Sequence, residues 1–547
     1  MLTAPRAAAL AAIGLLFVLP LLAALPLAVM QGASAAAWAS LFDDPHVSQS
    51  LALSVRSALA STLLALGLAL ALTTALHGSP AWLRLQSWLS PMLALPHAAF
   101  AIGLAWLVAP SGGLARLLAP LFGWAFPPDW TTVNDPGALL LTGVLVAKEL
   151  PFLMWSVMAL LARPEVAIQL QRQIAVGRTL GYGRAALWWR VLWPQWLPRL
   201  AWPLLAVLAY GLTVVDLALI VGPASPPTLA MLAYADLMAG DPARNARGSA
   251  AALLLAAVLA ALVIALWMAA VLFGRGWRRL AVSGRRRPVR GGSPSLAGRF
   301  FTALAGLYVL VVCILLALSV AGVWTFPAAW PQALTMDAWR QVAQSAGTLA
   351  GTAALAAAAA LLALGLVVGW FEAAPPRWDR SATPLVLAPL VLPPLLLMAG
   401  LYQAALALRL DGQWAGLLWV HVLVVLPYVF IALQPAWRSF DRRYEQAARA
   451  LGRSRPAFWW QVKWPLLAAP LAAAAAVGFA VSVAQYLATQ FIGAGRHATI
   501  TTEAVTLAAG GQRTQAAAFA LLQAALPLLA FGAAAWLGRR RLAAMRA

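Results

Sequence analysis

Two stretches of this chain repeat each other and decide its fold. The second reads QAARALGRSRPAFWWQVKWP over residues 446–465, and the first reads AVGRTLGYGRAALWWRVLWP over residues 175–194. Each places a glycine, Gly181 or Gly452, ahead of a double tryptophan and closes on Trp-Pro, at a constant offset in numbering. Chance similarity between apolar helices does not fix a polar segment in this way, so the sequence predicts an internal duplication.

The composition around these stretches is that of a membrane protein. The chain has 547 residues, 63% of them hydrophobic and only 10% charged, with a mean hydropathy of +0.83. These values lie outside the range of soluble globular domains. Apolar runs of about 20 residues, long enough to cross a bilayer as a helix, recur along the whole sequence. Twelve are predicted as spans of an all-α membrane protein: 9–30, 50–76, 89–109, 138–162, 201–221, 248–273, 300–324, 345–370, 382–408, 414–435, 466–492 and 516–537.

A basic segment divides these spans into two halves of six. Residues 274–299 contain Arg285-Arg286-Arg287-Pro288 and Gly291-Gly292-Ser293-Pro294, which are too polar for the membrane and too rich in Gly and Pro for a helix. We therefore expect a first half over 1–273 with a polar loop at 163–200, a cytoplasmic linker, and a second half over 300–547 with a loop at 436–465. Because six is even, the halves are parallel repeats. The Pro-rich stretch 384–394 predicts a broken helix.

The charge of the chain indicates its orientation. The formal net charge is +22, and most Lys and Arg fall in segments that share one side of the membrane if the N-terminus is cytoplasmic. The positive-inside rule then predicts that both termini are cytoplasmic. This distribution favours contact with anionic lipid and argues against a nucleic-acid partner. The N-terminal apolar run is longer than that of a usual signal peptide, so we expect an uncleaved first helix.

The repeated loop has the pattern of a docking element. Its residue order predicts a short amphipathic helix, a glycine that ends it, a second basic and aromatic helix, and a proline where the next span begins. A helix pair of this kind can sit in a groove of a cytosolic partner and transmit the partner's movement. The alternative is a helix pair that rests on lipid headgroups. The same spacing in both copies favours docking.

The loop resembles the cytoplasmic EAA motif of type I ABC importer permeases: Glu-Ala-Ala, three residues, Gly, nine residues, Ile, any residue, Leu, Pro. The second half has Gln446 at the Glu position beside Glu445, with Trp464 in place of the usual Leu, and it matches the motif at Ala447, Ala448, Gly452, Val462 and Pro465. The first half departs further from the motif. It has Ala175 at the Glu position and Val176-Gly177 at the Ala pair, and keeps Gly181, Val191 and Pro194.

The resemblance covers nearly the whole chain, and its fused two-half form is similar to permeases of ferric-iron, thiamine and putative-thiamine importers. Segments 215–223 and 493–505 resemble the last of these. The family implies a permease subunit of the bacterial inner membrane, a cytosolic ABC ATPase with one copy under each loop, and a periplasmic or lipid-anchored solute-binding protein. Thiamine, ferric iron, a polyamine, a phosphonate or an oxyanion all remain open as the solute.

The chain itself has no signature of an enzyme. A P-loop requires Gly-Lys-Ser/Thr, whereas the only lysines, Lys148 and Lys463, are followed by Glu149 and Trp464. ATP hydrolysis is therefore expected in a partner chain. No carboxylate pair, histidine cluster or activated nucleophile can be assembled, and the single cysteine, Cys313, excludes an intramolecular disulfide. We expect neither a cofactor nor a metal.

Charged residues inside spans are costly and mark the candidate solute path. Lys148 and Glu149 are neighbours in the fourth span and cannot share one helical face, so at least one needs a partner on another helix; ion pairing is favoured over solute contact. Asp216 in the fifth span, with Gln485 and Tyr486 at nearly the same depth of the second half, is predicted to line the path.

Other polar residues complete the hypothesis. Asp236 and Glu503 are expected to add, with Asp216, a weak negative field for a cationic solute, and His421 is expected to be a packing residue. The main rival is an ion-coupled secondary transporter with two parallel six-helix halves, which would not need matched docking loops.

Overall fold

The computed structural model describes residues 4–282 and 293–546. These residues form helices and loops, and within them the only strand-like feature is an isolated antiparallel bridge between Ala321 and Leu334. Nine described helices are long and apolar enough to cross a membrane, or eleven if each of two bent pairs is one span. The all-α membrane fold expected from composition is confirmed.

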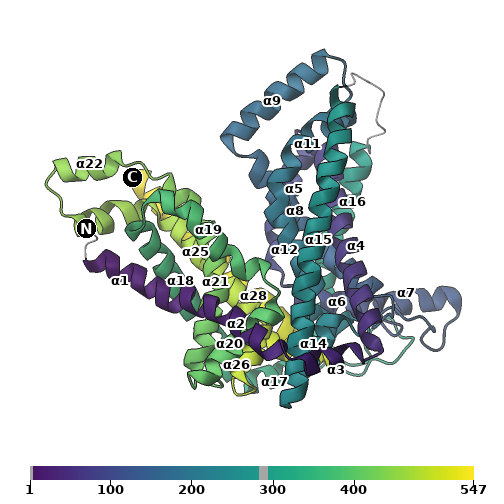
Figure 1. The fold of residues 1–547 in the computed structure, drawn as a ribbon. Helices are drawn as coiled ribbons and strands as arrows, with labels where there is room; N and C mark the ends of the chain where they lie inside the picture. The colour runs from purple at the N-terminus through teal and green to yellow at the C-terminus, as the bar shows by residue number, and fades with distance from the viewer. Residues whose placement is uncertain (1–3, 283–292, 547) are drawn as a thin grey trace. The chain divides into compact units, whose positions relative to one another are not determined.

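The chain packs as two compact units, one comprising Met1–Gln31 and Met336–Ala547 and the other Gly32–Thr335. The first helix of each predicted half packs among helices of the other half. α1 (Ala4–Ile13) lies on α18 (Ala346–Ala373), and α16 (Pro294–Ser319) lies on α6 (His97–Val108) (Figure 1). The sequence repeat and the packing units are thus different divisions of the chain.

The unit Gly32–Thr335 is organised around α4 (His46–Leu76), which packs against α8 (Leu139–Leu161) and α12 (Ala201–Thr213). The other helices of this unit are α3 (Ala35–Phe42), α5 (Pro80–Ala94), α7 (Gly113–Phe122), α9 (Pro164–Thr179), α10 (Arg184–Leu187), α11 (Trp193–Trp196), α13 (Asp216–Val221), α14 (Leu229–Leu237) and α15 (Pro242–Val282).

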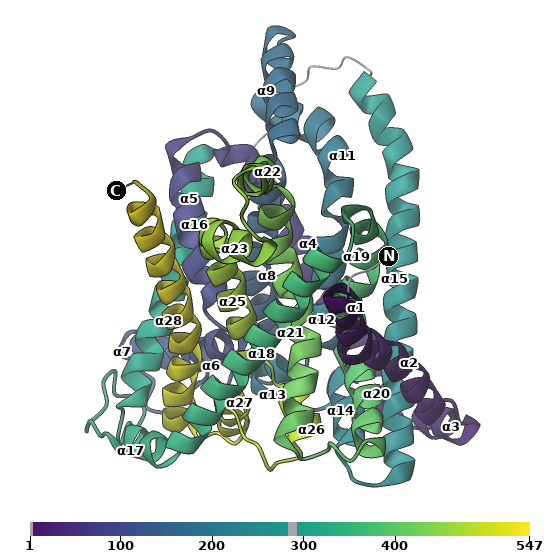
Figure 2. The same cartoon turned by 90° about the vertical axis from the view of Figure 1, so that its left-hand side faces the viewer.

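The other unit is organised in the same way around α18, which packs against α21 (Trp414–Arg438) and α25 (Ala468–Val483). α25 also lies alongside α28 (Arg513–Arg546) (Figure 2). The remaining helices are α2 (Leu19–Gly32), α17 (Asp337–Gln344), α19 (Asp379–Val391), α20 (Pro394–Ala407), α22 (Arg443–Ala450), α23 (Arg455–Phe458), α24 (Trp464–Leu466), α26 (Leu487–Gly493) and α27 (Ile500–Ala509).

The third span is broken at the same place in both halves. α5 ends and α6 begins around Leu95-Pro96, and α19 and α20 meet at Leu392-Pro393 with a bend of 99°. Proline lacks an N–H and disfavours a helical conformation in the residue before it, so each Leu-Pro step places the break. The broken helix predicted within 384–394 is confirmed.

The fifth span is also broken, which differs from the continuous helices expected over 201–221 and 466–492. α12 ends at Thr213 and α13 begins at Asp216, and α25 ends at Val483 while α26 begins at Leu487. Neither break contains proline or glycine. The hydropathy of the segment therefore gives no signal for it.

A hydroxyl on the central helix of each unit accepts a hydrogen bond from the first amide of α14 or α27, the second short helix after this break. The Leu229 N–H donates to Ser54 Oγ at 2.9 Å, and the Ile500 N–H donates to Thr352 Oγ1 at 3.0 Å. All four residues are buried. Helix starts have N–H groups without partners in their own helix, and inside a membrane the protein must supply the acceptor.

The basic linker is helical at both ends. α15 continues to Val282, and α16 begins at Pro294 after Ser293. Proline suits the first position of a helix, and the Arg, Leu and Ala residues before the linker favour helix. Its centre, with Arg285-Arg286-Arg287-Pro288, lies outside the described residues.

Replacing Thr352 with Val should remove the acceptor for the Ile500 amide at nearly constant volume. We expect a loss of about 1–3 kcal/mol in the free energy of unfolding because a buried N–H is left without a partner. Thermal unfolding in detergent measures this, with the exposed Thr506→Val as control. Equal stability of the two variants would contradict the role of Thr352.

Candidate functional site

The glycines of the repeated loops end their helices by the same hydrogen-bond pattern. φ is +79° at Gly181 and +69° at Gly452, in the left-handed region that favours glycine. In the first half the Tyr182 N–H donates to the Gly177 carbonyl, and in the second the Arg453 N–H donates to the Ala448 carbonyl. This is the Schellman motif, and the helix–glycine–helix structure expected of the loops is confirmed.

The segment after each glycine is also repeated in detail. A short helix, α10 or α23, passes into a π-helical turn at Trp188–Leu192 or Trp459–Lys463, after which Trp-Pro begins the next helix. We call residues 184–196 and 455–466 the coupling segments. Their shared π turn is irregular backbone at an identical place, which is typical of a functional constraint rather than of chance.

In the first half, the coupling segment is tied to the C-terminal end of α4. Arg184 donates to the carbonyls of Thr74 and His77, both at 2.6 Å, and Trp193 Nε1 donates to Thr74 Oγ1 at 2.9 Å. A cation at a helix C-terminus also complements the helix dipole. Three hydrogen bonds therefore join this segment to the end of α4.

His77, just beyond α4, lies between the rings of Trp82 and Trp188, at 5.4 and 5.3 Å. Burial lowers the pKa of His77, and the charge of Arg184 lowers it further. His77 is therefore neutral at pH 7, and its ring packs as an aromatic group.

In the second half, an acidic residue makes the corresponding tie. If α18 is aligned with α4 through Thr352 and Ser54, Glu372 stands where Thr74 stands. Glu372 forms ion pairs with Lys463 and, at 3.7 Å, with Arg455, both in the coupling segment. Lys463 also lies over the ring of Trp437 at 4.3 Å. The partners differ between halves, but the tie to the long helix is the same.

The short helices before the glycines present apolar side chains outward. Leu180 and Leu451, at matching positions directly before the glycines, are 48% and 79% exposed. Ala175, Gln446 and Ala447 are exposed, whereas Gly177 and Ala448 are buried beneath them. Because the two leucines stand at the same place in both halves, this surface is the candidate contact with another protein.

Lys148 closes the broken third span of the first half. Its Nζ donates to the carbonyls of Met92 and Leu95 at 3.0 and 2.5 Å, at the C-terminal end of α5. Only 2% of Lys148 is exposed. Its partners are therefore backbone carbonyls at the end of a helix, where no N–H of the same helix is available to donate to them. The sequence favoured an ion pair for Lys148, so its backbone partners were not predicted.

Glu149 lies on the other side of the same break. It is buried, and one of its oxygens is 3.7 Å from Nε2 of His97, the first residue of α6. Thus the ammonium group is at the negative end of α5 and the carboxylate is near the positive end of α6, as helix dipoles favour. Two residues that the sequence marked as a costly charge pair stabilise the two ends of a broken helix.

The residues expected to line the path lie at the fifth-span breaks. Asp216 is half-buried at the start of α13, which packs against α6, and His97 at the start of α6 packs against the ring of Tyr210 at 5.2 Å. In the second half, Gln485 is half-buried and Tyr486 buried, both between α25 and α26. The histidine was not singled out in the sequence, because nothing there shows that the two breaks approach each other.

Comparisons with known proteins agree with this geometry. Residues 362–543 match the family described as binding-protein-dependent transport system inner membrane component. Over 513 residues the chain is 36% identical to the inner membrane ABC transporter permease protein YnjC of Escherichia coli (strain K12), covering 92% of this chain and 91% of that protein. The chain belongs to the type I ABC importer permeases. A shorter stretch of the permease, 92 residues or 17% of its length, is 30% identical to the molybdenum transport system permease protein ModB of Mycobacterium tuberculosis, covering 35% of that protein.

His421 of the permease bridges the fifth-span break in the second half. Its Nδ1 is 2.8 Å from Ser482 Oγ in α25, and its Nε2 is 3.2 Å from Thr489 Oγ1 in α26. The residue is fully buried. It is a packing residue, as expected, that joins two helix segments by hydrogen bonds.

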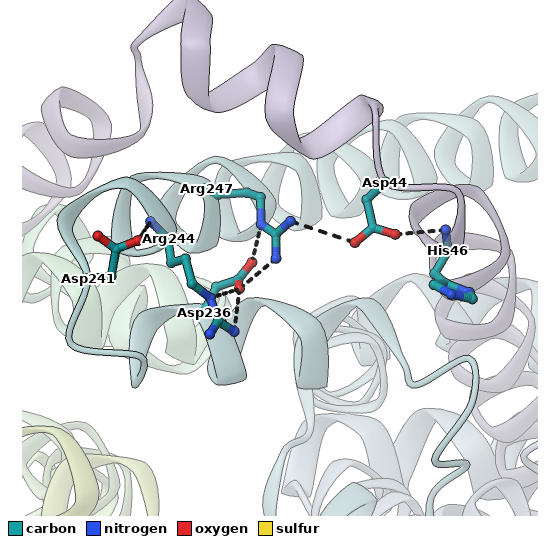
Figure 3. Close-up of polar contacts among 6 residues, drawn as sticks. All are labelled: Asp44, His46, Asp236, Asp241, Arg244 and Arg247. Atoms are coloured by element: carbon teal, nitrogen blue, oxygen red, sulfur yellow. Dashed lines mark hydrogen bonds and ion pairs between the residues drawn. The ribbon is translucent and has the colours of Figure 1, made fainter.

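Asp236 does not add a negative field to the path, and this expectation was wrong. It is 1% exposed, accepts hydrogen bonds from Arg244 and Arg247, and belongs to a network that Arg247 extends to Asp44 (Figure 3). Two guanidinium groups neutralise the carboxylate. The network instead ties the start of α15 to the loop before α4.

The described part of the permease contains no group of three His, Cys, Asp or Glu residues that could hold a metal ion.

A buried arginine was missed by sequence reasoning. Arg116 donates to the carbonyls of Trp324, Thr325 and Ala328, at 2.8–3.0 Å, and so holds the segment after α16. Its sequence context offers no signal, because the acceptors are backbone atoms more than 200 positions away.

Lys148→Met should leave the Met92 and Leu95 carbonyls without their donor. We expect a lower thermal midpoint, corresponding to about 1–3 kcal/mol, with transport per folded molecule retained. Unfolding in detergent and solute uptake in proteoliposomes measure the two properties. Unchanged stability with lost uptake would instead make Lys148 a solute contact.

Proposed function

We propose that this permease forms the path of a binding-protein-dependent importer and that a separate cytosolic ABC ATPase drives it through the two loops. One ATPase copy docks on each loop, over residues 163–200 and 436–465. The observation that carries the proposal is the repeated combination of a Schellman glycine, an exposed leucine and a tied coupling segment. A loop that only rested on lipid would not need the tie.

The ties suggest how force reaches the path. Each central helix contacts the coupling segment near its C-terminal end, at Thr74 or Glu372, and accepts the start of a short helix near its other end, at Ser54 or Thr352. At 1.5 Å per residue, these points are about 30 Å apart along the helix. α4 and α18 therefore act as levers between the docking loops and the short helices α14 and α27.

The proposal also specifies the orientation of the permease in the membrane and its partners. The docking loops, both termini and the basic linker are on the cytoplasmic side, where their Lys and Arg contact anionic lipid. The solute-binding protein, periplasmic or lipid-anchored, delivers solute at the opposite face. The loops need not bind equally, because Glu445 and Gln446 are replaced in the first half by Ile174 and Ala175.

The solute we favour is a small cation such as thiamine. In the first half, Asp216 stands at one helix break and Glu149, beside His97, at another, whereas apolar Leu487 and Val425 stand at the corresponding places in the second half. Gln485 and Tyr486 are proposed to add neutral polar contacts. A path with carboxylates on one half suits a positively charged group passing through.

Leu451→Asp should weaken docking because it places a charge in an apolar contact. We expect co-purification of the ATPase with the permease to fall about tenfold, while insertion and thermal stability stay unchanged. Leu451→Met, which keeps the apolar surface, is the control. Normal co-purification of the aspartate variant would argue against this surface as the docking site.

Asp216→Asn tests the electrostatic role on the path. For a cationic solute we expect uptake to fall about tenfold. The solute-loaded binding protein should still stimulate ATP hydrolysis. Uptake in proteoliposomes with the intact transporter measures this, with Gln485→Asn as a neutral change at a corresponding break. Normal uptake of a cation by Asp216→Asn would remove the electrostatic role.

A further inference from the structure

A cavity of about 210 Å³, partly open to the surface, is formed by residues of the unit built around α18, away from both coupling segments in sequence. It is bounded by the first turns of α18 and α21 and by the loop between α26 and α27. The residues used below are Gly347, Gly351, Trp414, Arg496, His497 and Thr499. Pockets for whole small molecules measure about 300–1,000 Å³, so this one suits a single small group.

The ionisable side chains at this cavity are basic. Arg496 and His497 line it, and no carboxylate is among its lining residues. Within the described part of the chain, no acidic side chain lies within ion-pair distance of Arg496. Arg496 is exposed at the cavity, and a guanidinium in such a position can bind an oxyanion.

The position of Arg496 is built into the loop. Gly412 takes φ +61°, and its N–H donates to the Ile492 carbonyl at 2.8 Å, which ties the loop before α21 to the end of α26. A Cβ at Gly412 would lie 3.0 Å from Cδ of Arg496. The arginine stem thus lies directly over a residue that has no side chain.

Helix starts add to the positive potential. Gly347 and Thr348 are in the first turn of α18, and Trp414 is the first residue of α21, whose N-cap residue makes no side-chain cap. Backbone N–H groups at helix starts favour anions. Alone these would not define a site, but here they border a cavity that already has two basic side chains.

The first half lacks this site. When Thr352 is aligned with Ser54, Leu53 stands in place of Gly351. When Ile500 is aligned with Leu229, the first half has Ser225 and Pro226 in place of Arg496 and His497. A Cβ added at Gly351 would meet no heavy atom within 4 Å. The glycine therefore leaves open the space that a leucine occupies in the other copy.

We infer that this cavity binds a phosphate group, of either free inorganic phosphate or a phospholipid headgroup. The inference does not depend on the proposed function, since it rests on the cavity and its charges alone.

The test uses the full-length permease with two variants that act differently. Arg496→Gln removes the guanidinium, whereas Gly351→Leu fills the cavity and keeps both basic side chains. Arg409→Gln, which removes an exposed arginine that does not line the cavity, is the control. In one arm, inorganic phosphate is titrated by calorimetry at constant ionic strength in detergent. In the other, retention of phosphatidylglycerol and of diacylglycerol is compared by native mass spectrometry.

Saturable binding of inorganic phosphate identifies a free anion site, and retention of phosphatidylglycerol over diacylglycerol identifies a headgroup site. In either case we expect affinity to fall about tenfold or more in Arg496→Gln and in Gly351→Leu and to stay unchanged in Arg409→Gln. Should one cavity variant misfold, the other decides. Absence of binding in both arms, or equal binding by wild type and the folded cavity variants, would overturn the inference.

Discussion

Backbone polar groups inside a bilayer must find partners within the protein, and this constraint governs the permease. Its third and fifth spans are broken in both halves, which frees carbonyls and amides in mid-helix. Lys148 closes one break through two carbonyls, and Ser54 and Thr352 accept the first amides of α14 and α27, the second short helices after the fifth-span breaks. The costly polar side chains of this chain are therefore the groups that make a discontinuous path compatible with the membrane.

The same central helices that carry these hydroxyls carry the ties to the coupling segments. Arg184 contacts the end of α4, and Glu372 at the end of α18 contacts Arg455 and Lys463. The chemistry of the tie differs between halves, while its place does not. A connection between loop and central helix is thus common to both halves, as the proposed relay of loop movement through α4 and α18 requires.

The sequence predicted what depends on periodicity and local chemistry. Hydropathy marked the membrane helices, the repeat marked the loops, and the Pro-rich stretch 384–394 marked a broken helix. It did not predict the breaks beside Asp216 and Gln485, because no residue there opposes helix, nor the neutralisation of Asp236, whose partners are on another helix. Lys148 and Glu149 were recognised as exceptional, but their backbone and histidine partners depend on tertiary packing that no local pattern encodes.

Disulfide cross-linking at the loops tests the central claim most directly. Leu180→Cys and Leu451→Cys would each be made in a Cys313→Ser background, which has no other cysteine, and paired with single cysteines along the proposed groove of the ABC ATPase. The account predicts that both positions cross-link to the ATPase in the assembled transporter, and that a cysteine at exposed Leu334 does not. An assembled, active transporter in which neither loop position cross-links, or in which both react with a membrane-impermeant thiol reagent from outside the cell, would contradict it.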